Sequence, residues 1–238
     1  MTGVEEERDG SPCADLLTRR AGVDAAAAAD ELLSELPGWL AATVDEDLAE
    51  ALLARGGELV RHADVMRKDL AHSPPPPTTA LAFELLPFHL DASPPRPWTA
   101  ALPGFLAAYP PEHPDHLPGG EDLIDSYLVE YTQRGRLGPL ITQASGFAVD
   151  GERVCGGLLI VDRADEGPWI SDVWRDPDYR CAGAGSALIT QAAPILRALG
   201  YDALGLAVTC SNRPAVRAYT RLGFIRTSTA WTIRLPSG

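Results

Sequence analysis

The order of apolar and polar residues divides this chain of 238 residues into stretches of helical and of strand-like period. In the N-terminal third, leucines recur at helical spacing within an alanine-rich segment, and aspartates and glycines stand where helices begin and end. The predicted elements are a helix over 24–36, an apolar run over 39–44, a helix from Asp45 or Asp47 to Gly56-Gly57, and a strand over 59–70.

Strand-like and helical periods also alternate downstream of residue 80. The turn Asp150-Gly151-Glu152 predicts a hairpin, and longer amphipathic segments predict helices. The expected elements are strands over 80–87, up to Val149, and over 153–161, 169–175, 203–209, 224–227 and 229–235, with helices within 98–138 and over 183–199 and 212–222. This alternation indicates an α/β fold whose central sheet is mixed.

A polyproline run separates the two parts of the chain. Neither a helix nor a central strand can contain it, because proline lacks a backbone N–H. We therefore expect an N-terminal α/β extension over 1–72, a linker over 73–79 and a second domain over 80–238. Residues 1–72 hold 16 acidic and 7 basic side chains, against 17 and 13 in the remainder, so the acidity mainly solvates the N-terminal part.

Composition excludes several classes of protein. The net charge of −13 argues against nucleic acid as a partner, because phosphate contacts require a basic surface. No apolar run reaches the ~18 residues of a membrane span, and the N-terminus is acidic where a signal peptide would be basic, which predicts a cytoplasmic protein. The four cysteines lie far apart, and His113 and His116 lack a third ligand nearby. The sequence therefore predicts neither a disulfide framework nor a metal site. Its abundant arginine, alanine and proline are typical of a GC-rich bacterial genome.

A glycine-containing segment lies between a predicted strand and a predicted helix: Arg180-Cys181-Ala182-Gly183-Ala184-Gly185-Ser186. Glycines let a backbone approach a ligand closely, and the free N–H groups of a first helical turn bind anions. A diphosphate would fit there, although simple turn chemistry produces the same pattern. Leu188 stands where a dinucleotide fingerprint needs glycine, and the Gly-Lys-Ser/Thr of a P-loop is absent.

A second motif follows the next predicted strand: Asn212-Arg213-Pro214-Ala215-Val216-Arg217-Ala218-Tyr219, with Gly223-Phe224 shortly afterwards. Together the two motifs resemble the GNAT superfamily of N-acetyltransferases, whose pattern Arg-x-x-Gly-x-Gly, Asn-x-x-Ala-x-x-x-Tyr and Gly-Phe occurs here in the same order and spacing. The resemblance covers about residues 80–238 and is firm from 169 onward. It implies a mixed, mostly antiparallel sheet flanked by helices.

The resemblance also implies roles for individual residues. Acetyl-CoA would be the co-substrate and a primary amine the acceptor, without a metal; a homodimer is compatible with it. By similarity, the backbone from Cys181 to Ser186 would hold the CoA diphosphate. The remaining cofactor-binding candidates are Trp174, Arg175, Arg180, Asn212 and Ala215.

Tyr219 would be the general acid that protonates the departing CoA thiolate. An amine with a pKa of ~10 must first lose a proton, and the oxyanion that follows needs donors already in place. The amine's proton needs a general base. The candidates in the sequence are Asp172, on the strand before the glycine segment, and Glu166, in the turn leading to that strand. The alternative for Asp172 is a solvent-facing or capping role.

A faint internal repeat aligns residues 38–59 with 204–225 at an offset of 166. Glu46 and Leu53 stand at the positions of Asn212 and Tyr219, so this copy lacks their chemistry. We interpret it as a degenerate half of the same fold, with alanine-rich coincidence as the alternative. The leading function is an acetyltransferase; the rivals are a non-catalytic acyl-CoA-binding or regulatory module and a general α/β nucleotide binder.

Overall fold

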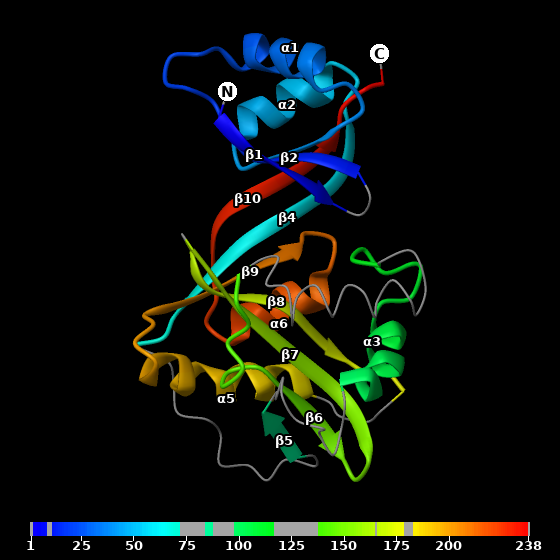
Figure 1. Ribbon diagram of the computed structural model, residues 1–238, viewed down its shortest axis with the longest axis vertical. Coiled ribbons are helices and arrows are strands. Elements are labelled where there is room, and N and C mark those ends of the chain that lie inside the picture. Colours follow the sequence, from blue (N-terminus) through cyan, green and yellow to red (C-terminus); the bar gives the residue numbers. More distant parts are fainter. Residues whose placement is uncertain are drawn as a thin grey trace. The chain divides into compact units, whose positions relative to one another are not determined.

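The computed structural model describes residues 2–8, 11–71, 84–87, 98–116, 138–164, 166–178 and 183–237 (Figure 1). The chain forms two compact units: the first holds residues 1–66, 207–210 and 226–238, and the second holds 67–206 and 211–225. This division does not follow the order of the sequence, because C-terminal residues complete the first unit. The predicted linker over 73–79 lies outside the described residues.

The first unit is built on strands in the order β1-β2-β3-β10-β4. β1 and β2 form an antiparallel hairpin, β2 pairs with β3 in parallel, and β3 pairs with β10 in the antiparallel direction, with Thr43 opposite Trp231. The elements are β1 (Thr2–Arg8), β2 (Ser11–Thr18), α1 (Ala25–Glu35), β3 (Leu40–Thr43), α2 (Glu46–Ala54), β4 (Glu58–Asp69) and β10 (Ile225–Arg234).

The helices α1 and α2 pack against each other in this unit (Figure 1). Alanines and leucines at helical spacing supply their buried faces, as the sequence predicted. They enclose a core with residues of β2, β3 and β10, comprising Ala14, Leu17, Ala28, Ala29, Leu32, Ala41, Leu48, Ala49, Leu52, Ile233 and Leu235.

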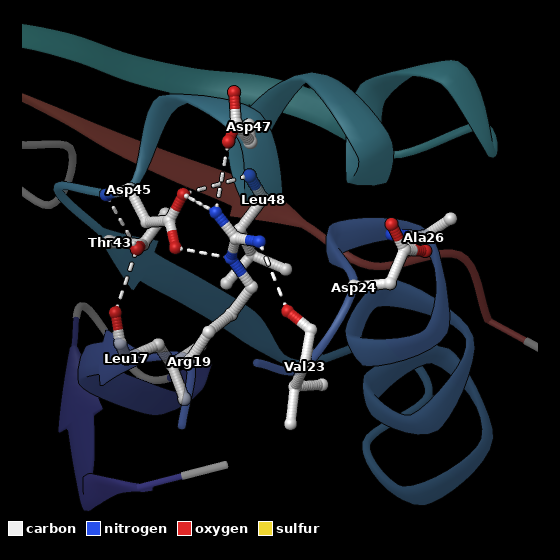
Figure 2. A network of polar contacts seen from close by, with 9 residues as sticks. All are labelled: Leu17, Arg19, Val23, Asp24, Ala26, Thr43, Asp45, Asp47 and Leu48. Atoms are coloured by element: carbon white, nitrogen blue, oxygen red, sulfur yellow. Dashed lines mark hydrogen bonds and ion pairs between the residues drawn. The ribbon is translucent and has the colours of Figure 1, made fainter. Parts of the chain in front are cut away.

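A polar network fixes the N-terminus of α2 against β2 and β3 (Figure 2). The Asp45 carboxylate accepts the Leu48 N–H at 3.2 Å and caps the helix, as the sequence predicted for Asp45 or Asp47. The Arg19 guanidinium donates to the same carboxylate at 2.5 and 2.9 Å and to Asp47 at 3.0 Å. Thr43 extends the network, because its hydroxyl donates to a carbonyl of β2 at 2.7 Å and accepts the Asp45 N–H at 3.0 Å.

The second unit contains strands in the order β9-β8-β7-β6-β5. Neighbours from β5 to β8 are antiparallel, whereas β8 and β9 are parallel. The elements are β5 (Glu84–Pro87), a 3₁₀ turn (Trp98–Ala101), α3 (Leu102–Ala108), β6 (Gly146–Asp150), β7 (Arg153–Arg163), β8 (Gly167–Arg175), α5 (Ala184–Ala198), β9 (Ala203–Thr209) and α6 (Arg213–Arg221). The predicted α/β class with a mixed, mostly antiparallel sheet flanked by helices is confirmed.

Two adjacent glycines of β7 show which helix covers which face of this sheet. A Cβ on Gly156 would meet Ala184 of α5 at 3.5 Å, whereas a Cβ on Gly157 would overlap the Trp174 ring at 1.9 Å. Trp174 belongs to the core cluster of Phe105 on α3. Because neighbouring side chains of a strand point to opposite faces, α5 and α3 cover opposite faces of the sheet.

The structure differs from the predicted strands in two places. The hairpin of β1 and β2 was not predicted, because the TGVEEER sequence of β1 carries no alternation of apolar and polar residues. The two strands expected over 224–227 and 229–235 are one continuous strand, β10, whose threonines favour extended backbone throughout. No helix in the described part of the chain is both long enough and apolar enough to cross a membrane.

Candidate active site

The first turn of α5 carries the described part of the glycine segment. Gly183 precedes the helix with a φ of 93°, a left-handed conformation that favours glycine, and a Cβ there would meet no atom within 4 Å. A Cβ on Gly185 would meet Val173 of β8 at 3.2 Å, so this turn lies against β8. Among the described residues, none fills the space beside Gly183 and no side chain caps the first N–H groups of the helix. The other predicted residues of the segment are Ala184 and Ser186, in the same turn, and Arg180, Cys181 and Ala182, outside the described residues.

β8 changes its pairing in the middle of the strand. It pairs with β9 through Trp169–Gly205 and Ile170–Leu206. Directly after these pairs, the register with β7 shifts, which leaves Ser171 as the extra residue of a β-bulge. Bulges re-aim side chains and are frequent beside active sites. The bulge therefore sets the direction of the strand end that carries Asp172 and Trp174.

The Trp174 side chain is part of the aromatic core. Its ring packs against Phe105 and Phe147 at centroid distances of 5.2 and 6.0 Å, and the absence of a side chain on Gly157 makes room for it. Its Nε1 is buried and has no hydrogen-bond partner in the described part of the chain. The backbone of Trp174 and this N–H are the groups with which it could meet a ligand. Arg175 next to it is exposed.

Asn212 is the N-cap of α6. Its Oδ1 accepts the Ala215 N–H at 3.3 Å, so these two predicted cofactor-binding residues form a local hydrogen bond with each other. The Asn212 amide nitrogen lies 3.4 Å from Nε2 of His113. The N-cap signal of an asparagine before Pro214 was present in the sequence, but the contact with His113 crosses 99 residues and was not predictable from it.

Tyr219 lies in the last turn of α6. Its carbonyl accepts the Phe224 N–H at 3.0 Å, and its ring packs against the buried Phe224 ring at 5.8 Å. Gly223, with a φ of 87°, makes the left-handed turn that brings Phe224 back to the helix. The Gly-Phe pair of the sequence motif therefore anchors the tyrosine to its own helix end.

A segment after α3 joins β8 to the N-terminus of α6. The Tyr109 hydroxyl donates to the Val173 carbonyl at 3.2 Å, and the Tyr109 and His113 rings stack edge to face at 5.0 Å. Nδ1 of His113 accepts the Asp115 N–H at 3.1 Å, while its other ring nitrogen faces Asn212. Nδ1 of His116 contacts the Tyr109 carbonyl at 2.7 Å. Both histidines of the metal-like pair thus make contacts within the protein.

Electrostatics connect these groups across the site. Burial raises the pKa of Tyr219 above its ordinary value, and the negative charges of Asp115 and Asp172 raise that pKa further. Burial also raises the pKa of Tyr109, assisted by Asp172, Tyr219 and Asp115. Both phenols are therefore protonated at neutral pH and can donate a hydrogen bond or a proton. The carboxylates of Asp115 and Asp172 thus influence the pKa of both phenols, Tyr109 and Tyr219.

The two candidate bases lie in different places. Asp172 is 9% exposed and shares the face of Trp174, because the two residues are separated by one along β8. Glu166 pairs with Arg163 at 2.7 Å in the turn before β8. Six residues of strand correspond to roughly 20 Å, so Glu166 is remote from Asp172 and from the phenols. Chemically, the site combines a carboxylate able to accept a proton with phenols able to supply one.

Sequence reasoning missed the contributions of Tyr109 and Asp115. Neither stands in a motif, and both belong to the proline-containing segment between α3 and residue 116. No local signal marked either residue, because the segment carries no recognisable motif. Its residues reach Val173 and Asn212 only after the sheet has formed.

Comparison with known proteins identifies the family. The family model described as "Acetyltransferase (GNAT) family" matches residues 96–224, more than half of the chain. A curated relative, the mycothiol acetyltransferase of Actinosynnema mirum, is 33% identical over 186 residues, covering 76% of this chain and 58% of the relative. The chain thus spans about 58% of the length of that relative.

Solved structures show the same fold. A GCN5-related N-acetyltransferase from Sphaerobacter thermophilus superposes with a TM-score of 0.60 at 19% identity, covering 83% of this chain and 60% of that one. A tandem GNAT protein from the clavulanic acid biosynthesis pathway also gives a TM-score of 0.60 at 15% identity, covering 96% of this chain and 76% of that one. Taken with the family match over residues 96–224, the chain belongs to the GNAT acetyltransferase family.

Proposed function

We propose that this chain transfers an acetyl group from acetyl-CoA to a primary amine by direct attack in a ternary complex. The observation that carries the proposal is the position of Tyr219, a phenol kept neutral by burial and by the charges of Asp115 and Asp172. A neutral phenol beside a carboxylate is the pair that this reaction needs. Family membership supports acetyl transfer as the reaction type.

The co-substrate would be held by the first turn of α5 and by the end of β8. The first turn of α5, from Gly183 to Ser186, would receive the diphosphate on its backbone N–H groups, since no described residue fills the space beside Gly183. The end of β8 would align the acyl arm, and the buried Nε1 of Trp174, which has no partner among the described residues, lies on this part of the strand.

Tyr219 would act as the general acid. As the thioester carbon–sulfur bond breaks, its hydroxyl would give a proton to the departing sulfur, and the attacking amine would lose one to Asp172, directly or through water. The CoA thiol has an ordinary pKa near ~8.5, so the help from Tyr219 is modest on the scale of general acids. We expect Tyr219→Phe to lower kcat by about 10²-fold, at the low end of the usual range.

A thiol-release assay tests this proposal. Free CoA would be measured with acetyl-CoA and four amines: glucosamine, an aminoglycoside, a peptide with a free N-terminus and Nα-acetyl-lysine. Because a mycothiol acetyltransferase is 33% identical, we propose a small-molecule amine as the first class to examine. Faster thiol release with an amine, lost in Tyr219→Phe, supports an enzyme. Binding of acetyl-CoA without amine-dependent release would instead favour a non-catalytic acyl-CoA-binding module.

The first unit is, we propose, a degenerate half of the same fold. At the offset of 166, β3, α2 and β4 correspond in order to β9, α6 and β10. The N-terminus of α2 is occupied by its own Asp45 and by the Arg19 guanidinium (Figure 2). That arrangement fits a structural copy rather than a second CoA site.

A further inference from the structure

A single lysine occurs in this chain, and it is buried. Lys68, near the end of β4, is 6% exposed. Its Nζ donates a hydrogen bond to the Leu222 carbonyl, and a Cβ on Gly223 would lie 3.3 Å from the same nitrogen. Burial lowers the pKa of Lys68, because an environment of low polarity disfavours the charged ammonium. A position of that kind calls for a compensating interaction or a functional reason.

The carbonyl that Lys68 binds lies at the C-terminus of α6. Leu222 is the C-cap, and its own N–H returns to Ala218. The last carbonyls of a helix lack partners within the helix and carry the negative end of its dipole. An ammonium placed there satisfies the carbonyl and stabilises the helix end at once.

The same turn contains Tyr219. The Phe224 N–H donates to the Tyr219 carbonyl at 3.0 Å, and Gly223 donates to Thr220 at 3.1 Å, which forms a left-handed helix stop. The Phe224 ring, 1% exposed, packs against the Tyr219 ring. Lys68 is thus bonded to the turn that fixes both the backbone and the ring of the tyrosine.

We propose that Lys68 is a positioning residue, whose ammonium holds the C-terminal turn of α6 and thereby the hydroxyl of Tyr219. This inference rests on the proposed function of Tyr219 as general acid. Lys68 acts through the Leu222 carbonyl and not on the substrates. A misplacement of about 1 Å at a catalytic group can cost ~10²-fold in rate, so a loosened turn has a measurable effect.

The neighbouring residue on β4 provides a matched control. Arg67 also donates to a backbone carbonyl, that of Glu166 in the turn before β8, and as neighbours on a strand Arg67 and Lys68 point to opposite faces of β4. Arg67→Met and Lys68→Met each remove one cation of β4 and leave one carbonyl without its donor. Only the second change touches α6.

The test measures kcat, the KM for acetyl-CoA and amide hydrogen exchange in Lys68→Met, Lys68→Arg, Arg67→Met, Tyr219→Phe and the double variant Lys68→Met/Tyr219→Phe. The amine is the member of the panel with the highest rate. We expect Lys68→Met to lower kcat about tenfold with KM changed less than about twofold, and to speed exchange of residues 218–224 about tenfold or more. Lys68→Arg should recover most of both losses, and Lys68→Met should add nothing to Tyr219→Phe.

Unchanged kcat and exchange in Lys68→Met, or a loss of kcat that persists in full on the Tyr219→Phe background, would overturn the proposal. Two results would be failures of the proposed function: no amine is acetylated, or Tyr219→Phe keeps full activity. Amide exchange needs no turnover, so in both cases it still tests whether Lys68 holds the C-terminal turn of α6. If Lys68→Met does not fold, Lys68→Gln, which keeps an N–H donor without charge, takes its place in every comparison.

Discussion

The proposed diphosphate site at the start of α5 can be tested by a pair of substitutions, one at each end of the helix. Gly183 and Gly200 flank the helix with φ angles of 93° and 92°, and a Cβ at either position would meet no atom within 4 Å. Tryptophan at either position carries the same backbone strain, roughly 1–2 kcal/mol for a non-glycine residue in the left-handed region. Only Gly183→Trp would place an indole in front of the free N–H groups.

The expected magnitudes follow from mass action. Acetyl-CoA at about a hundred times its dissociation constant adds ~2.7 kcal/mol to the free energy of unfolding. At ~2–4 °C per kcal/mol for a chain of this size, the native midpoint should rise by about 5–10 °C. Gly200→Trp should start from a lower midpoint and show the same rise, whereas Gly183→Trp should show none. The assay is thermal unfolding followed by circular dichroism with and without acetyl-CoA.

An equal rise in native protein and Gly183→Trp would refute the location of the site. No rise in the native protein would mean that the glycine segment is merely a turn, and that the acetyl-CoA assignment is wrong. A rise lost in both variants would show that strain in α5, and not the blocked N-terminus, abolishes binding.

Two further predictions follow from the charges of the molecule. Because burial and nearby carboxylates raise the pKa of Tyr219, kcat should show no decline from this group below about pH 10, and a decline centred near pH 9 that Tyr219→Phe abolishes would contradict the raised pKa. Asp45→Ala removes a helix cap and the partner of Arg19, so urea unfolding at pH 7 should show a loss of about 1–2 kcal/mol, whereas Asp47→Ala, at a carboxylate 75% exposed, should change stability by less than ~0.5 kcal/mol. The Arg19 guanidinium lowers the pKa of Asp45 from 3.8, so the stabilisation by the Asp45 carboxylate is complete above pH 3.8 and is lost as the pH falls through the lowered value. A difference in stability between the native protein and Asp45→Ala that persists below the lowered pKa would contradict this account.

The sequence by itself determined the elements whose signals are local. Helical spacing, the aspartate before α2 and the glycines at both ends of α5 predict helix boundaries, because capping and left-handed turns depend on residues a few positions apart. The strands from β6 to β9 were also recognisable, because their apolar runs and the turns between them are local features of the sequence. The two motifs of the glycine segment and of Asn212 to Phe224 also sufficed to indicate the family, since each is a short run with a fixed spacing.

The tertiary structure alone decided which distant residues meet. The contacts of Tyr109 with Val173 and of His113 with Asn212, and the bond from Lys68 to Leu222, join segments between 64 and 154 residues apart. No periodicity encodes such contacts, because they exist only once strands have paired and helices have packed on the sheet. The membership of β10 in the first unit has the same origin: a strand's partner is set by the edge that folding leaves available, and not by its own sequence.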